Sequence, residues 1–284
     1  MQGAAGVGAS GGGGAMSQQN YLMESDDEAL RLDLKTDRLA VLRQARWAGI
    51  RPGMRVADLG CGSGKTTAVL HELVQPGGQA VGVDISDKRV AFAAQRYGHT
   101  GAVFTRADVR EPNPGLGMFD AIWIRFVLEY YRAESAEIVR GIASLLKPGG
   151  LLCLLDLDSN CLCHHEMPPR LELTMHEIMS ALSARANFDP YAGRRLYAHL
   201  YDHGFGEIAV TVEGHHLIYG ELRASDAFNW MKKIEVAPQR IGYRFPRYPG
   251  GYDEFREEFE RFFADPRRFT FSPLVIAVGK KLRA

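Results

Sequence analysis

The chain of 284 residues has little cysteine, no long hydrophobic run and no excess of either sign of charge. Its four cysteines are too few and too clustered for a secreted disulfide framework, which favours a reducing, cytoplasmic location. No apolar run approaches the roughly 20 residues needed to cross a bilayer, so we expect no membrane partner. Basic and acidic residues both total 34, which favours a small-molecule partner over nucleic acid.

The first 16 residues are rich in glycine, alanine and serine. They have neither the positive start nor the apolar centre of a signal peptide. We therefore expect a disordered lead-in over residues 1–16 and one domain over residues 17–284. We expect this domain to be a monomer or a homodimer.

From residue 51 to about residue 156, short β-branched runs alternate with helical patterns, and a helical pattern over residues 25–50 precedes them. This alternation is typical of βαβ units. It predicts an α/β fold with a doubly wound, mostly parallel seven-stranded sheet and helices on both faces. The expected strands cover residues 55–59, 80–84, 102–106, 119–125, 151–155, 207–218 and 270–280.

Two stretches, about 157–190 and 219–268, interrupt this regularity with further helical patterns and with a turn-rich segment over residues 238–251. The second stretch is a helical insertion before the last strand. Ligands bind such sheets at the carboxyl ends of the strands, so we expect these stretches to be lid elements, with simple packing against the sheet as the alternative.

The most informative segment, residues 58–66, joins the first expected strand to the next helix and reads Asp-Leu-Gly-Cys-Gly-Ser-Gly-Lys-Thr. Glycines at alternate positions let the backbone turn sharply and approach a ligand. A dinucleotide fingerprint requires glycine where Lys65 stands, so that match fails. A phosphate-binding P-loop requires glycine where Leu59 stands, so that match is incomplete.

An acidic residue followed by Gly-x-Gly-x-Gly fits residues 58–64 at every position, and here the chain resembles the class I S-adenosylmethionine-dependent methyltransferases. Asp84 ends the second expected strand, where nucleoside-binding folds hold ribose hydroxyls, and Asp108 ends the third. Each acid alone is also explained as a helix N-cap, but three in succession favour a cofactor site. The resemblance continues through residues 117–130 and 145–150.

The resemblance implies S-adenosylmethionine as the cofactor. Asp58 suits the ammonium group of its methionine part, Asp84 the ribose, and Asp108 the adenine amino group, while the main-chain carbonyl of Arg125 points to the cofactor's amino group. Tyr21 is expected to close over the cofactor. The complete set of expected cofactor-binding residues is Tyr21, Asp58, Gly60, Cys61, Gly62, Gly64, Asp84, Ile85, Asp108, Val109 and Arg125.

Methyl transfer needs alignment of the acceptor and exclusion of water, and it demands no fixed catalytic residue. Tyr130 is expected to line the substrate pocket, although an aromatic residue after a strand also packs. Where a proton must leave, the candidate bases are Asp156, His164 and His165, with loop or capping roles as the alternatives.

Cys161-x-Cys163-His164-His165 contains four side chains that bind zinc in other proteins. The spacing is wrong for a zinc site and no second cysteine pair follows, so we expect no metal. His215 and His216 lie in an alternating strand, which predicts one ring facing inward and the other outward, both in packing roles.

These observations predict S-adenosylmethionine-dependent methyl transfer to a small-molecule acceptor. The absence of an Asn-Pro-Pro-Tyr motif disfavours base-amino methylation, and the segment 125–130 resembles relatives that methylate small metabolites. One alternative is a non-catalytic cofactor-binding or scaffold protein of the same fold. The other is a P-loop nucleotidase, suggested by the Gly-Lys-Thr of residues 64–66.

Overall fold

The computed structural model describes residues 28–282, so Tyr21 and the expected lead-in lie outside the described residues. Two helices come first, α1 (Glu28–Lys35) and α2 (Arg38–Trp47). Asp37 separates them because its Oδ1 accepts hydrogen bonds from the backbone N–H groups of Leu39 (2.8 Å) and Ala40 (3.3 Å). This N-cap explains why the helical pattern of residues 25–50 contains two helices.

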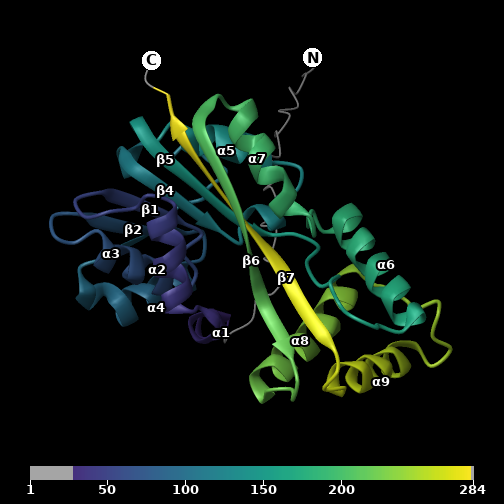
Figure 1. Cartoon of the computed structure of the whole chain (residues 1–284). Coiled ribbons are helices and arrows are strands. Elements are labelled where there is room, and N and C mark those ends of the chain that lie inside the picture. The colour runs from purple at the N-terminus through teal and green to yellow at the C-terminus, as the bar shows by residue number, and fades with distance from the viewer. Residues whose placement is uncertain (1–27, 283–284) are drawn as a thin grey trace, which may run out of the picture.

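Within the described range, seven strands form one sheet in the order β3-β2-β1-β4-β5-β7-β6 (Figure 1). Neighbouring strands from β3 to β5 pair in parallel, whereas β7 is antiparallel to both β5 and β6. The predicted fold class is confirmed, and the reversed β7 makes the sheet mixed. The strands are β1 (Arg55–Leu59), β2 (Gln79–Asp84), β3 (Val103–Arg106), β4 (Phe119–Arg125), β5 (Leu146–Leu157), β6 (Phe205–Tyr219) and β7 (Phe269–Lys281).

Helices cover both faces of this sheet. On one face α2 and α3 (Lys65–Leu73) pack with α4 (Asp87–Tyr97) beside them, and on the other lie α5 (Ser135–Ala143) and α7 (Ala192–Asp202). Successive residues of a strand point to opposite faces, so β4 supplies Trp123 to the first core and both Ile122 and Ile124 to the second. All three side chains are fully buried.

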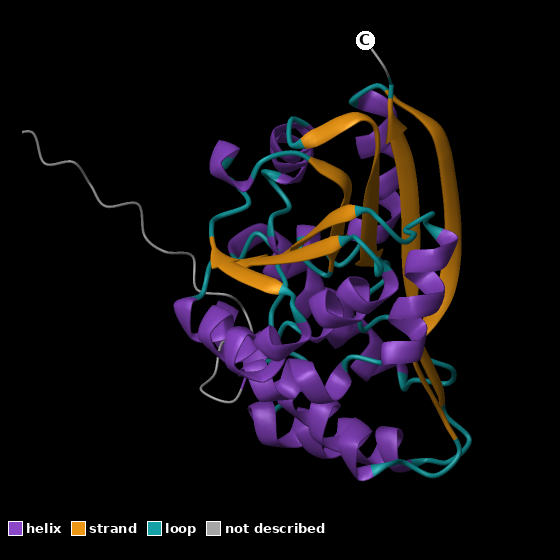
Figure 2. Cartoon of the chain, turned by 90° about the vertical axis from the view of Figure 1, so that its left-hand side faces the viewer, coloured by secondary structure: helices purple, strands orange, loops and turns teal. Residues whose placement is uncertain are grey.

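Three further helices gather beyond one end of the sheet, α6 (Pro169–Arg185), α8 (Ala224–Ile241) and α9 (Gly251–Ala264) (Figures 1 and 2). They share a core of their own, and the strands β6 and β7 extend toward it (Figure 1). Large buried members of this core include Met175, Ile178, Leu182, Trp230, Ile234, Phe255, Phe259 and Phe263. No helix of residues 28–282 is long and apolar enough to span a membrane.

Several boundaries differ from the sequence prediction, among them the start of β5 at Leu146 and the end of α8. The turn-rich stretch expected from residue 238 begins later, because α8 continues through Pro238 as far as Ile241. Proline lacks a backbone N–H but stands here in the last turn of the helix, near the end that Gly242 makes with a φ of 61°.

Candidate cofactor site

A cavity of about 890 Å³ lies at the carboxyl ends of β1, β2, β3 and β4. Its volume is in the range of cofactor and ligand sites. Gly64 does not line it, and Tyr21 lies outside the described residues. Tyr130 lines it, as do most of the expected cofactor positions: Asp58, Gly60, Cys61, Gly62, Asp84, Ile85, Asp108, Val109 and Arg125.

The turn after β1 requires glycine for two reasons. Gly60 and Gly64 have φ angles of 79° and 83°, in the left-handed region that favours glycine. A Cβ atom on Gly60 would lie 2.4 Å from Cγ2 of Val127, and one on Gly64 would lie 2.6 Å from Cβ of Ala93. The two glycines therefore let the turn pass close to Val127, which follows β4, and close to α4.

Asp84 joins this turn to the end of β2. Its Oδ2 accepts a hydrogen bond from Gly62 N (3.0 Å), and its Oδ1 accepts from Ser86 N (3.0 Å) and from Nε of Arg89 (3.0 Å). The ion pair with Arg89 is buried. A carboxylate has about four acceptor positions, so one remains for a ligand hydroxyl at this cavity wall.

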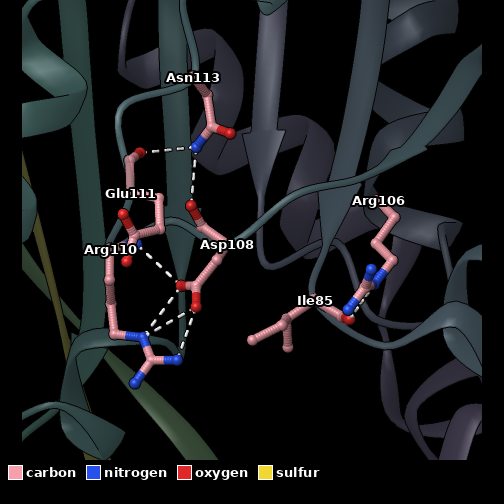
Figure 3. A network of polar contacts seen from close by, with 6 residues as sticks. All are labelled: Ile85, Arg106, Asp108, Arg110, Glu111 and Asn113. Carbon is pink, nitrogen blue, oxygen red and sulfur yellow. Dashed lines mark hydrogen bonds and ion pairs between the residues drawn. The ribbon is translucent and has the colours of Figure 1, made fainter. Parts of the chain in front are cut away.

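Asp108, at the end of β3, is held by the loop that follows it (Figure 3). Arg110 donates to both carboxylate oxygens, with Nε 3.0 Å from Oδ1 and Nη2 2.6 Å from Oδ2, and Asn113 donates to the main-chain oxygen of Asp108 (2.7 Å). Burial alone raises the pKa of Asp108, but the hydrogen bonds from Arg110 bring it below the ordinary value. Asp108 is therefore a fixed carboxylate at the cavity wall.

Asp58 and Arg125 end neighbouring strands, and both line the cavity. Burial raises the pKa of Asp58 to about 7, although Thr67 donates a hydrogen bond to its Oδ2 (2.6 Å). Burial lowers the pKa of Arg125 to about 10, so its guanidinium stays charged at neutral pH. Its Nε is buried and has no hydrogen-bond partner in the described part of the chain.

The three candidate bases do not line this cavity. Asp156 is fully buried and accepts hydrogen bonds from the backbone N–H groups of Glu129 and Leu157, each at 3.0 Å. His164 is held between Thr270 Oγ1 (2.8 Å) and the main-chain oxygen of Cys161 (3.1 Å). His165 is exposed.

The geometry at Lys65 also bears on the P-loop alternative. Its Nζ donates to the main-chain oxygen of Asp33 (2.9 Å), and Lys65 does not line the cavity. A P-loop lysine points at phosphate groups, and this one holds α1 instead.

In the described range, no group of three or more histidine, cysteine, aspartate and glutamate side chains is arranged to hold a metal ion. Cys161 and Cys163 are free thiols.

The sequence did not predict the side chains that hold the three aspartates. These are Arg89 at Asp84, Arg110 at Asp108 and Thr67 at Asp58. Arg110 lies two residues from its partner, so an Asp-x-Arg pattern was the available signal. Arg89 and Thr67 meet their partners only because α4 and α3 fold back against the strand ends.

The known proteins that are similar in sequence to this chain include methyltransferases. Residues 56–150 match the family described as a methyltransferase domain. Over 140 residues the chain is 33% identical to the ubiquinone/menaquinone biosynthesis C-methyltransferase UbiE of Pseudomonas putida, a match that covers 45% of this chain and 54% of that protein. The chain spans about half the length of the curated relatives it matches.

Solved structures share the fold at low sequence identity. YcgJ of Bacillus subtilis is 18% identical with a TM-score of 0.56, and the alignment covers 87% of this chain and all of that one. Phosphoethanolamine N-methyltransferase 2 of Haemonchus contortus, solved with S-adenosyl-L-methionine, is 17% identical with a TM-score of 0.56, covering 95% of this chain and 61% of that one.

Residues 56–150 match a methyltransferase domain, and the sheet order and the glycine turn agree with the class I S-adenosylmethionine-dependent fold. These findings support S-adenosylmethionine as the cofactor. Within that class, its matched segment is similar to the quinone C-methyltransferase UbiE.

Proposed function

We propose that the protein transfers the methyl group of S-adenosylmethionine to a small-molecule acceptor. The observation that carries this proposal is the extent of the cavity. Beyond the glycine turn and the three acids, it is lined by Tyr130, by residues 183–187 at the end of α6, and by Arg240 of α8. This extension provides room for an acceptor beside the cofactor, and the similarity to UbiE supports an acceptor of small-metabolite size.

The cofactor supplies a methyl group that its positive sulfur has already activated. The chain's own residues bind and orient it: Asp58 pairs with the ammonium group, Asp84 with the ribose, and Asp108 lies on the adenine side. The ends of α6 and α8 act as lid elements that keep water from the reacting atoms. These roles need no catalytic metal.

Calorimetric titration of the purified protein tests the cofactor site against the P-loop alternative. We expect S-adenosylmethionine to bind and ATP with Mg²⁺ not to bind. Lys65→Ala should leave the cofactor affinity within about twofold, because Lys65 contacts α1 and not the cavity. Binding of ATP that is lost in Lys65→Ala would contradict the proposal.

Turnover separates an enzyme from a non-catalytic protein of the same fold. With the methyl-labelled cofactor and pools of small metabolites, we expect label to pass to an acceptor and S-adenosylhomocysteine to form in equal amount. Tight cofactor binding with no labelled product from any pool would favour the scaffold alternative.

Cofactor affinity should rise with pH because of Asp58. Its pKa of about 7 means that the carboxyl must lose a proton to pair with an ammonium group. Between pH 5 and pH 7 we expect the affinity to increase about tenfold to hundredfold. By the same linkage the raised pKa stabilises the unliganded fold at low pH, and this contribution is lost as the pH rises through 7.

Calorimetry at several pH values measures this dependence, with Asp58→Asn as the matched variant. Asparagine keeps an oxygen that can accept the hydrogen bond of Thr67, so its affinity should be lower and nearly constant from pH 5 to pH 7. No histidine is among the described residues that line the cavity. If the cofactor affinity of the native protein and of Asp58→Asn changed equally with pH, Asp58 would not be the group that causes the pH dependence.

A further inference from the structure

Three arginines from three separate elements line the part of the cavity that extends beyond the glycine turn. They are Arg132 in the loop between β4 and α5, Arg185 in the last turn of α6, and Arg240 in the last turn of α8. We call them the arginine group. All three side chains are exposed, so a ligand that enters the cavity can reach them. In the described part of the chain, these three elements contribute no carboxylate to the cavity wall.

Hydrogen bonds join the three elements around Asn187, which follows α6. The main-chain oxygen of Asn187 accepts from the N–H of Arg132 (2.9 Å), and its Oδ1 accepts from the N–H of Ala133 (2.9 Å). Nη1 of Arg185 donates to the main-chain oxygen of Ile241 (3.0 Å), which ties the end of α6 to the end of α8. The fold therefore fixes the positions from which the three arginine side chains reach the cavity.

The acids that line the cavity interact with other cations. Among the described residues, each of these acids has a basic side chain outside the arginine group, and the pairs are Asp84 with Arg89, Asp87 with Arg106, Asp108 with Arg110 (Figure 3) and, through their charges, Asp58 with Arg125. Arg132 and Arg185 form no ion pair within residues 28–282. They therefore bring positive charge to the cavity that no such pair neutralises.

Glu134 is the acid nearest to Arg132 in the sequence, and it does not remove this charge from the cavity. Its Oε2 accepts a hydrogen bond from Nδ2 of Asn187 (2.6 Å), and Glu134 does not line the cavity. The arginine side chains, which do line it, therefore stay the nearer partners for a ligand.

A structural role explains only part of this arrangement. A cation in the last turn of a helix stabilises its C-terminal end, which accounts for the positions of Arg185 and Arg240. Arg132 lies in a loop, and its side chain has no hydrogen-bond partner among the described residues. A guanidinium group carries five N–H donors, and Arg185 uses Nη1 on Ile241. Both side chains therefore keep donors for a ligand.

The cofactor does not supply a balancing negative charge. S-Adenosylmethionine carries a sulfonium and an ammonium group against one carboxylate, so its binding adds positive charge to the cavity. A cavity lined by charges of one sign attracts ligands of the opposite sign. The remaining ligand of a methyl transfer is the acceptor, and the arginine group favours an acceptor with a negative charge.

We propose that the acceptor carries an anionic group, a carboxylate or a phosphate, and that Arg132 and Arg185 bind this group with Arg240 beside them. This inference rests on the proposed methyl transfer and names its substrate class. A planar guanidinium group pairs with two oxygens of a carboxylate or phosphate at once, which fixes the direction of the acceptor as well as its affinity. The arginines are specificity-determining residues and take no part in the transfer itself.

Binding of small probes tests the preference for an anion without turnover. Full-length protein saturated with S-adenosylhomocysteine is titrated with benzoate, with phenyl phosphate and with benzamide, which is a neutral analogue of benzoate. The aromatic ring suits a wall that includes Tyr130 and Tyr131. We expect at least one anion to bind at least about tenfold more tightly than benzamide. The anion that binds more tightly distinguishes a carboxylate from a phosphate acceptor.

Substitution of the arginines tests which side chains cause the preference. Arg132→Met and Arg185→Met should each weaken binding of the preferred anion at least about fivefold and leave benzamide binding within about twofold. Arg244→Met is the matched control, because Arg244 is an exposed arginine just after α8 that does not line the cavity. Its affinities for all three probes should stay within about twofold of those of the native protein.

Two further measurements separate a role in binding from a structural one. Raising the salt concentration from about 50 mM to about 500 mM should weaken anion binding by the native protein and leave benzamide binding unchanged. With the methyl-labelled cofactor and metabolite pools divided on an anion-exchange resin, we expect label to enter the retained metabolites. For that acceptor, Arg132→Met should raise KM at least about fivefold and leave kcat within about twofold.

Equal affinity of the native protein for the anions and for benzamide would overturn the proposal, as would equal anion binding by Arg132→Met and Arg244→Met. Label that enters only the unretained metabolites would also overturn it. If the arginine variants do not fold, the anion preference of the native protein and its salt dependence still decide the outcome. Titration with S-adenosylhomocysteine alone distinguishes the two levels of inference. Binding of that ligand without an anion preference rejects only the acceptor class, whereas failure to bind it rejects the proposed function as well.

Discussion

Asp84→Ala is expected to lower the affinity for S-adenosylmethionine at least about hundredfold, the largest effect of any single change at the cavity. The substitution removes the acceptor proposed for the ribose, and charged hydrogen bonds of this kind contribute about 1.5–3 kcal/mol. It also releases the N–H of Gly62, so the glycine turn keeps only its backbone hydrogen bonds to Val83 of β2. The buried guanidinium of Arg89 would lose its carboxylate, which costs about 3–5 kcal/mol of stability.

Calorimetric titration and thermal unfolding measure the two effects separately. Asp87→Ala is the matched control, because Asp87 also lines the cavity but is exposed and pairs with exposed Arg106 at 3.4 Å. Its affinity and melting temperature should change little. Equal losses of affinity in the two variants would show that Asp84 has no special part in cofactor binding.

Gly60→Ala should destabilise the fold by about 2–5 kcal/mol. The left-handed conformation costs a side chain about 1–2 kcal/mol, and the overlap with Cγ2 of Val127, only 2.4 Å away, adds about 1–3 kcal/mol. Gly53→Ala is the comparison, since Gly53 has a similar φ of 85° but no atom within 4 Å of the added Cβ. We therefore expect Gly53→Ala to lower the free energy of unfolding only by the cost of the left-handed conformation.

Urea unfolding of both variants measures the difference, and a double variant tests its cause. Val127→Ala removes the atom that a Cβ on Gly60 would meet, so Gly60→Ala should cost less in that background than in the native chain. Equal costs for Gly60→Ala and Gly53→Ala would contradict the packing explanation and leave only the backbone conformation.

Features that depend on adjacent residues could be predicted from the sequence. The alternating strands and helices and the glycine turn are local patterns, and Asp58, Asp84 and Asp108 each follow a run of strand residues. In parallel strands, such residues meet at one edge of the sheet. Sequence order was therefore enough to place these three acids around one cavity.

Features that depend on contacts between distant elements could not be predicted in this way. The prediction that the rings of His215 and His216 face opposite sides was wrong, because a bulge turns both inward and leaves no mark in an alternating sequence. Arg132 and Arg185 become notable only when the loop after β4 meets the end of α6. Asp156 follows a strand as the other acids do, but its carboxylate turns toward the N–H of Glu129 and not toward the cavity.

The reversed strand β7 has a consequence for how such a protein diversifies. β6 ends at Tyr219 and β7 begins at Phe269, and these two residues are paired across the sheet. Residues 220–268 therefore leave and rejoin the sheet at one point, and their exchange between related chains would require no new register in the other strands. Evolution can therefore replace residues 220–268, with α8 and α9, and change the side chains that face the cofactor cavity, while strands β1 to β4 stay the same. A segment from a related protein can be grafted in the laboratory at the same two boundaries.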